Sequence, residues 1–241
     1  MYRERIYKHY VSGREQPLAP DTPEGLSPRK AYLLRLIRNY FPKDFDSEIL
    51  ELGCGHGALV YFAILVGYHK VFGVDASQEQ VAAAHHLGIG TVRQGDVFEE
   101  LKSSPDETYG AVIAFDVIEH LNRNELFALV DEVRRVLKKG GRFIVHVPNA
   151  ESPFFGRVRY GDLSHEMAFT TTSIDQVFLS SGYSSVACYE DQPVVHGVKS
   201  AMRWTIWRMI RGCLRLYLVA ETGSNGRGAI FSQNLLAIAI K

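Results

Sequence analysis

The chain has 241 residues, which suits one large domain or one domain with an insertion. Hydrophobic residues make up 46% of it, enough for a sizeable core. Its 27 basic side chains balance 27 acidic ones, and this balance weighs against bulk nucleic acid as a partner. Three cysteines give no disulfide framework, and the charged N-terminus has no apolar signal region. We therefore expect a protein of the cytoplasm.

The chain divides into two expected parts. Residues 1–44 are mostly polar, and Ser27-Pro28 has the cap and the first-turn proline of a helix start. Four apolar residues also predict a short helix before it: Ile6, Tyr7, Tyr10 and Val11. Residues 45–241 form the main domain, with a helical insertion expected at about 193–229.

The most informative stretch is the glycine turn Gly53-Cys54-Gly55-His56-Gly57, which follows an apolar run ending in Glu51. A strand that turns through glycines into a helix brings backbone N–H groups against a ligand, because no Cβ blocks the approach. A second apolar run ends in Asp75, about 20 residues on, where dinucleotide folds place an acid on the ribose. A dehydrogenase would show G-x-G-x-x-G, whereas this turn reads G-x-G-x-G.

Strand and helix patterns alternate from residue 48 onward. Strands are expected at about 48–52, 70–74, 90–93, 110–115, 142–147, 185–189 and 234–240. Helices are expected at about 57–67, 77–87, 123–138 and 172–181. This alternation favours an α/β fold, in which right-handed crossovers place helices on both faces of a mostly parallel sheet.

Four motifs occur in one order along residues 45–190: the glycine turn, Asp75, Asp96 after a third strand and Asp116 after a fourth. Their order and spacing resemble the class I S-adenosylmethionine-dependent methyltransferases. The resemblance implies a Rossmann-like three-layer sandwich, with a mostly parallel seven-stranded sheet and a C-terminal antiparallel hairpin. It also implies that residues 1–44 fold over the cofactor as a helical lid, with a partly ordered tail as the alternative.

The same resemblance implies S-adenosylmethionine as cofactor and S-adenosylhomocysteine as product. The implied cofactor residues lie at successive strand ends: Glu51, Gly53, Cys54, Gly55, Gly57, Asp75, Ala76, Asp96, Val97 and Phe115. Glu51 would meet the ammonium group, and Asp75 would accept from both ribose hydroxyls. Asp96 would accept from the adenine amino group, while Phe115 would lie beside the methionyl chain.

The acceptor side has four candidate catalytic residues. Asp116, Glu119 and His120 stand at i, i+3 and i+4, so they share a face if this segment is helical. His165 lies in the loop after the fifth strand, where it would overhang the acceptor pocket. A hydroxyl acceptor must lose a proton, so a base or a metal would assist the transfer.

Binding of a divalent metal ion at this site is possible from the sequence but is not the favoured interpretation. The pattern resembles the small-RNA 2′-O-methyltransferases and the ubiquinone-pathway O-methyltransferases, which carry an E-x-x-E-H element and a later histidine. Here Asp116 replaces the first glutamate, and Tyr160-Gly161-Asp162 stands where a histidine pair is expected. We therefore favour His165 as a base or orienting group, and a purely structural histidine remains an alternative.

The loop before His165 is aromatic and basic, with Phe154, Phe155, Arg157, Arg159 and Tyr160. Aromatic faces stack on sugars, and arginines hold phosphate or carboxylate groups. We predict O-methylation of a sugar, a glycan or another small-molecule hydroxyl. A phenolic or quinone precursor, an N- or C-methylation and a cofactor-binding module without activity remain alternatives.

The insertion contains an amphipathic helical pattern over residues 198–219. Its apolar side comprises Met202, Ile206, Met209, Ile210, Cys213, Leu216 and Tyr217. Arg208, Arg211 and Arg215 fall on another side, with Trp204 among them. Three interpretations stay open: a helix packed on the core, a lid or homodimer surface, and a helix on the anionic inner face of a membrane.

Overall fold

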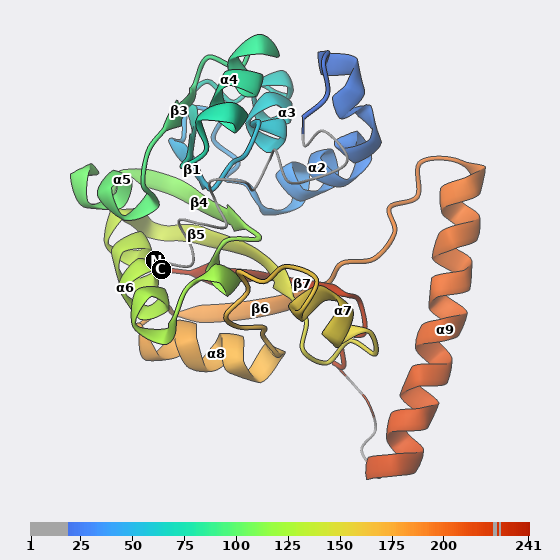
Figure 1. Ribbon diagram of the computed structural model, residues 1–241. Helices are drawn as coiled ribbons and strands as arrows, with labels where there is room; N and C mark the ends of the chain where they lie inside the picture. Colours follow the sequence, from blue (N-terminus) through green and yellow to red (C-terminus); the bar gives the residue numbers. More distant parts are fainter. Residues whose placement is uncertain (1–18, 224–225, 227) are drawn as a thin grey trace.

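A seven-stranded sheet forms the centre of the computed structural model (Figure 1), which describes residues 19–223, 226 and 228–241. The strands are β1 (Ile49–Leu52), β2 (Val71–Asp75), β3 (Val92–Gln94), β4 (Tyr109–Phe115), β5 (Leu137–Pro148), β6 (Ser185–Glu190) and β7 (Asn234–Ile240). Their order is β3-β2-β1-β4-β5-β7-β6, and only β7 runs antiparallel to its neighbours. The predicted Rossmann-like sheet with its C-terminal antiparallel hairpin is confirmed.

Helices cover both faces of the sheet. One layer holds η1 (Pro23–Leu26), α2 (Ser27–Tyr40), α3 (Ala58–Val66) and α4 (Gln78–His86); the other holds α5 (Val97–Ser103), α6 (Arg123–Val136) and α8 (Thr171–Ser180). Alternate residues of β4 point to the two layers: Ala111 and Ile113 join the α2–α4 core, whereas Val112 and Ala114 join the α6–α8 core. A strand covered on both faces is apolar throughout, as the sequence of β4 is.

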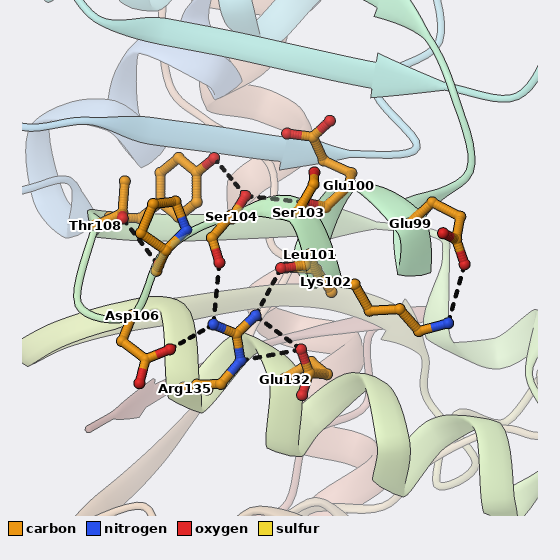
Figure 2. Close-up of polar contacts among 12 residues, drawn as sticks. Glu99, Glu100, Leu101, Lys102, Ser103, Ser104, Asp106, Thr108, Glu132 and Arg135 are labelled. Atoms are coloured by element: carbon orange, nitrogen blue, oxygen red, sulfur yellow. Dashed lines mark hydrogen bonds and ion pairs between the residues drawn. The ribbon is translucent and has the colours of Figure 1, made fainter.

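Helix α5 was not predicted, because seven residues are too short to establish a helical period. Asp96 caps it, since the Asp96 Oδ1 atom accepts hydrogen bonds from the backbone N–H groups of Phe98 and Glu99 at 2.8 and 3.2 Å. Arg135 of α6 then fastens the end of α5, donating to the Leu101 and Ser104 carbonyls at 2.7 and 3.0 Å (Figure 2). The helix therefore holds its place through contacts far apart in the sequence.

The boundary between α6 and β5 differs from the expectation of a helix to residue 138 and a strand from 142. The helix ends at Val136, and β5 already begins at Leu137, which pairs with Tyr109. The register then shifts before Arg142, and a Cβ on Gly141 would lie 2.8 Å from the Lys138 carbonyl oxygen. The glycines at this point thus accommodate an irregularity inside a long strand rather than capping a helix.

Helix α2 brings the N-terminal part of the described chain to the sheet. Leu33 and Ile37 are buried against the main domain, and Arg142 donates to the Tyr40 carbonyl at 2.6 Å. Tyr32 reaches the carboxyl edge of the sheet, where its ring centroid lies 6.5 Å from that of Phe115. The helix predicted around residues 6–11 lies outside the described residues, so the lid role of the segment stays a prediction.

Helix α9 (Val198–Thr222) lies between β6 and β7 in the chain and stands apart from the layered domain (Figure 1). The expectation that its apolar side packs on the core is wrong, because Met202, Met209 and Leu216 are all at least 60% exposed. Among the described residues, no helix is long and apolar enough to cross a membrane. The apolar side of α9 is therefore exposed rather than packed on the core.

Candidate functional site

The glycine turn after β1 has the open backbone that its spacing predicts. Gly53, Gly55 and Gly57 have φ angles of +62°, +55° and +75°, which residues with a side chain rarely adopt. A Cβ on Gly53 would also lie 2.6 Å from the Val117 side chain. The turn therefore presents backbone groups rather than side chains at the carboxyl edge of the sheet, where ligands bind in folds of this kind.

Glu51 is buried at the end of β1, and its Oε2 atom has no hydrogen-bond partner among the described residues. Burial raises the pKa of this carboxyl to about 8, while the nearby charge of Arg29 opposes the rise. A buried carboxylate without a partner is costly, so it favours a ligand that brings a positive charge. The ammonium group of S-adenosylmethionine fits this requirement.

Asp75 closes the same turn from β2. Its two carboxylate oxygens accept hydrogen bonds from the Gly55 and Ser77 backbone N–H groups, at 2.7 and 2.8 Å. Burial raises the pKa of Asp75, and these two hydrogen bonds oppose the rise. Each oxygen of a carboxylate accepts more than one hydrogen bond, so Asp75 can hold the turn and still bind ribose hydroxyls.

The remaining predicted cofactor residues take different positions. The Cys54 sulfur points inward, where it occupies the space that a Cβ on Gly73 would need, so Cys54 offers only its backbone to a ligand. Ala76 and Asp96 are exposed at neighbouring strand ends, and Val97 is half-buried against the core. Phe115 is half-buried beside the ring of Tyr32.

Asp116 does not share a surface with Glu119 and His120 in the way that a regular helix would require. It follows β4 with a φ of +55°, and its Oδ1 atom lies 2.7 Å from His146 Nδ1. Such a backbone angle in a residue with a side chain is strained and is typical of functional sites. The turn that follows, η2 (Ile118–His120), is a short 3₁₀-helix rather than an α-helix.

His146 is the residue that sequence reasoning missed. It lies buried in β5 between two carboxylates, Asp116 at 2.7 Å and Asp191 at 3.3 Å. Burial alone would lower the pKa of His146, but these two acids raise it to about 10. In turn, burial would raise the pKa of Asp116, yet the hydrogen bond from His146 lowers it. His146 is thus a fixed cation that positions Asp116.

Glu119, His120 and His165 form a second cluster. Their ligand atoms all lie within 4.8 Å of one another, and the two imidazole rings meet edge to face at 4.7 Å between centroids. The backbone holds the two segments together, because the N–H groups of Glu166 and Met167 donate to the Glu119 carbonyl at 2.8 and 3.0 Å. The structure therefore unites three of the four predicted catalytic residues.

The carboxylate of Glu119 is fully buried, and neither of its oxygens has a hydrogen-bond partner among the described residues. Burial, followed by the charge of Asp116, raises the pKa of Glu119 well above its ordinary value. A cation or a charged imidazole facing this carboxyl would favour its ionised form. Among the described residues, Glu119 thus lacks partners on both oxygens, whereas Glu51 lacks one on Oε2 only.

Both histidines are oriented through Nδ1. His165 Nδ1 donates to the Val158 carbonyl at 3.1 Å. His120 Nδ1 lies 2.9 Å from the Ser164 hydroxyl, which itself donates to Asp162 and so accepts from the imidazole. Nε2 then carries the lone pair in each neutral ring. Burial and the nearby His165 lower the pKa of His120, which favours that neutral form.

The seven-stranded sheet and its two helical layers have the fold of the class I S-adenosylmethionine-dependent methyltransferases, as the sequence predicts. Within it, residues 49–141 match the model of the family described as "Methyltransferase domain". The matched segment runs from β1 into the start of β5, so it contains the glycine turn, the strand-end acids, Glu119 and His120.

Curated relatives match part of the chain. The ubiquinone biosynthesis O-methyltransferase of Rickettsia bellii is 29% identical over 118 residues, which are 46% of this chain and 47% of that protein. The mitochondrial ubiquinone biosynthesis O-methyltransferase of Rattus norvegicus is 31% identical over 109 residues, 42% of this chain and 31% of that protein. The match thus spans less than half the length of either relative.

Solved structures show the same fold over the whole chain. A SAM-dependent methyltransferase from Archaeoglobus fulgidus aligns with a TM-score of 0.68 over 99% of both chains, at 20% identity. Phosphoethanolamine N-methyltransferase 2 of Haemonchus contortus, solved with S-adenosylmethionine, has a TM-score of 0.61 at 16% identity. It covers 100% of this chain and 57% of that one.

Proposed function

We propose that the protein transfers the methyl group of S-adenosylmethionine to a hydroxyl oxygen. The observation that carries this proposal is the Glu119, His120 and His165 cluster, a buried carboxyl beside two oriented imidazoles. Methyl transfer itself needs little more than in-line placement, since the sulfonium already activates the methyl group. A hydroxyl acceptor must also lose its proton, and a cluster of proton-accepting groups serves that need.

The strand ends would bind the cofactor. Glu51 supplies a carboxylate for the ammonium group, and Asp75 supplies acceptors for the ribose hydroxyls while holding the glycine turn. His146 keeps the Asp116 carboxylate ionised and fixed, so the negative charge at the end of β4 stays constant through the reaction. These residues bind and orient the cofactor; they take no proton from the acceptor.

The His120 and His165 pair would accept the proton of the hydroxyl. Each ring donates through Nδ1 to the protein, so the Nε2 lone pair is the basic position. The lowered pKa of His120 keeps it unprotonated at neutral pH, before the acceptor arrives. The proton would pass to one of these nitrogens as the acceptor oxygen attacks the methyl carbon.

The same three side chains fit a divalent metal ion. Glu119 offers two oxygens that lack partners among the described residues, and both histidines donate their Nδ1 hydrogen to protein groups, as metal-binding imidazoles usually do. A bound ion would lower the pKa of an acceptor hydroxyl. Asp116 would stay outside the set, because His146 holds it.

Two acceptor classes have support. A sugar or glycan hydroxyl suits the loop that carries α7 (Phe155–Arg159), where Phe154 and Tyr160 are 68% and 75% exposed and offer flat apolar faces. A phenolic hydroxyl, as on a quinone precursor, suits the names of the two curated relatives. The cluster would deprotonate either acceptor, and the phenol needs the weaker base.

The test is methyl transfer from labelled S-adenosylmethionine to a panel of glycans, simple sugars and catechols, with and without a chelator. We expect a labelled methyl ether, and its loss in Glu119→Gln and His120→Gln while cofactor binding persists. Label on nitrogen or carbon, or unchanged transfer in both variants, would overturn the proposal. Loss of transfer on chelation would assign the metal to the cluster.

A further inference from the structure

Helix α9 presents a continuous apolar surface that the candidate site does not use. Six large side chains on one side of it are each between 45% and 70% exposed: Met202, Ile206, Met209, Ile210, Leu216 and Tyr217. At about 100° per residue they fall within roughly a third of the helix circumference. An apolar stripe of this kind normally faces a core, so its exposure along several turns marks a binding surface.

Contacts on the opposite side of α9 keep its apolar stripe turned away from the domain. Arg211 Nε lies 2.9 Å from Glu190 Oε2, and the Glu190 side chain is buried in β6. Trp204 and Trp207 are half-buried on the same side, and the Arg208 guanidinium stacks on the Trp204 ring at 5.0 Å. A buried carboxylate without its cation is costly, so the ion pair keeps the basic side inward and the apolar side outward.

Helix α9 has far more basic than acidic residues. The helix carries five basic residues, namely Lys199, Arg203, Arg208, Arg211 and Arg215, and a single acid, Glu221. The chain as a whole has no net charge, so the rest of it is acidic in balance. Lys199 and Arg203 are exposed beside the apolar stripe, which places positive charge at its border.

We propose that α9 docks the protein on an anionic membrane surface. The apolar stripe would enter the boundary between headgroups and acyl chains, while Lys199 and Arg203 at its border would meet lipid phosphates. A helix with basic borders and one apolar side lies in the membrane plane, in agreement with the absence of any spanning helix among the described residues. The proposal is independent of the acceptor chemistry at the methyltransferase site.

A second copy of this chain fits the stripe less well. In a two-fold contact with the helices parallel, Lys199 and Arg203 of the two copies would approach one another. With the helices antiparallel, Glu221 would lie near Lys199 of the other copy, and no second acid of α9 would meet Arg203. The helix offers only Glu221 as an acid to offset those charges. Like charges brought together at an interface oppose association, whereas lipid phosphates would complement them.

The experiment is vesicle co-sedimentation of the full chain, with vesicles of phosphatidylcholine alone or with about one-third phosphatidylglycerol. We expect binding to the anionic vesicles only, and weaker binding as salt is added. The triple variant Met202→Gln, Ile206→Gln, Met209→Gln should bind at least about tenfold more weakly. The double variant Lys199→Gln, Arg203→Gln should lose about tenfold.

Two control variants carry equivalent changes elsewhere. Leu65→Gln with Leu179→Gln alters exposed apolar residues of α3 and α8, and Lys138→Gln with Lys139→Gln removes exposed charges of β5. Both controls should bind the anionic vesicles as wild type does, and unchanged thermal unfolding of all variants would exclude misfolding.

Two results would overturn the membrane assignment. One is failure of the wild-type protein to bind anionic vesicles. The other is a dimer in sedimentation velocity without lipid that the triple apolar variant converts to monomer, which would assign the stripe to an interface between copies.

Discussion

The cofactor edge and the proton-accepting cluster each contain a buried carboxyl with at least one oxygen that lacks a hydrogen-bond partner among the described residues, yet the two are built differently. Glu51 lies in β1 two positions before Gly53 of the glycine turn, so its position follows from a few consecutive residues. Glu119 meets His165, which lies 46 positions further along the sequence, and the contact depends on how a loop folds over the sheet edge. One region therefore follows from local sequence, while the other depends on tertiary structure.

The variant with the largest expected effect disrupts only the cofactor edge. Asp75→Ala removes both the acceptor for the Gly55 N–H and the acceptor for the ribose, so cofactor affinity should fall at least about a hundredfold. Titration calorimetry would measure it. Asp106→Ala is the matched control, because Asp106 is an exposed partner of Arg135 in the α5–α6 contact. Wild-type affinity in Asp75→Ala would remove Asp75 from the site.

The variant with the next largest effect disrupts only the cluster of Glu119, His120 and His165. Glu119→Gln keeps the size of the side chain but removes its titratable carboxyl, so the methyl-transfer rate should fall about a hundredfold, the range of general acid–base effects. Cofactor affinity should stay unchanged, since Glu119 lies with His120 and His165 and is not one of the proposed cofactor-binding residues. Single-turnover kinetics and calorimetry separate the two quantities, with Glu99→Gln as the exposed control. Equal loss of both would mean that the two regions act as one.

The pH dependence of stability tests whether His146 is charged in the folded protein. Its pKa of about 10 in the folded protein lies above the ordinary value near 6.5, so its stabilising contribution is complete below about pH 6.5. That contribution is lost as the pH rises toward 10. Chemical denaturation of wild type should therefore show falling stability across this window, and His146→Gln should flatten the fall. A parallel decline in both proteins would contradict the charged His146.

The smallest effect concerns the dual role of Asp96. Asp96→Ala removes the cap of α5 and should lower the free energy of unfolding by about 1 kcal/mol. Asp96→Asn keeps a capping oxygen, so it should preserve stability while lowering affinity if the residue also binds adenine. Denaturation and calorimetry on the two variants would separate these roles. Equal stability of wild type and Asp96→Ala would contradict the cap.

Prediction from sequence succeeded where a single local pattern decides the outcome. The apolar runs of β1, β2 and β4, each followed by an acid, give both the sheet and the strand-end positions of Glu51, Asp75 and Asp116. His146 could not be found in this way, because a histidine inside an apolar strand resembles a core residue. Its partner Asp191 lies 45 residues away, and no local pattern joins them.

Helix α9 shows the same limit in another form. Its sequence correctly indicates which residues share a side of the helix, but the period does not reveal which side faces the domain. That choice depends on Glu190, a buried acid of β6 that pairs with Arg211. A long-range ion pair thus reverses the orientation that hydrophobicity alone would favour.

The role of Glu51 in cofactor binding is tested most directly by the number of protons released when S-adenosylmethionine binds at pH 7. With a pKa of about 8, Glu51 is mostly protonated in the unbound protein and should ionise when the ammonium group arrives. Calorimetry in buffers of different ionisation enthalpy should therefore show proton release that disappears in Glu51→Gln. Absence of binding, or identical proton release in wild type and Glu51→Gln, would contradict the central claim that this buried carboxyl awaits the cofactor.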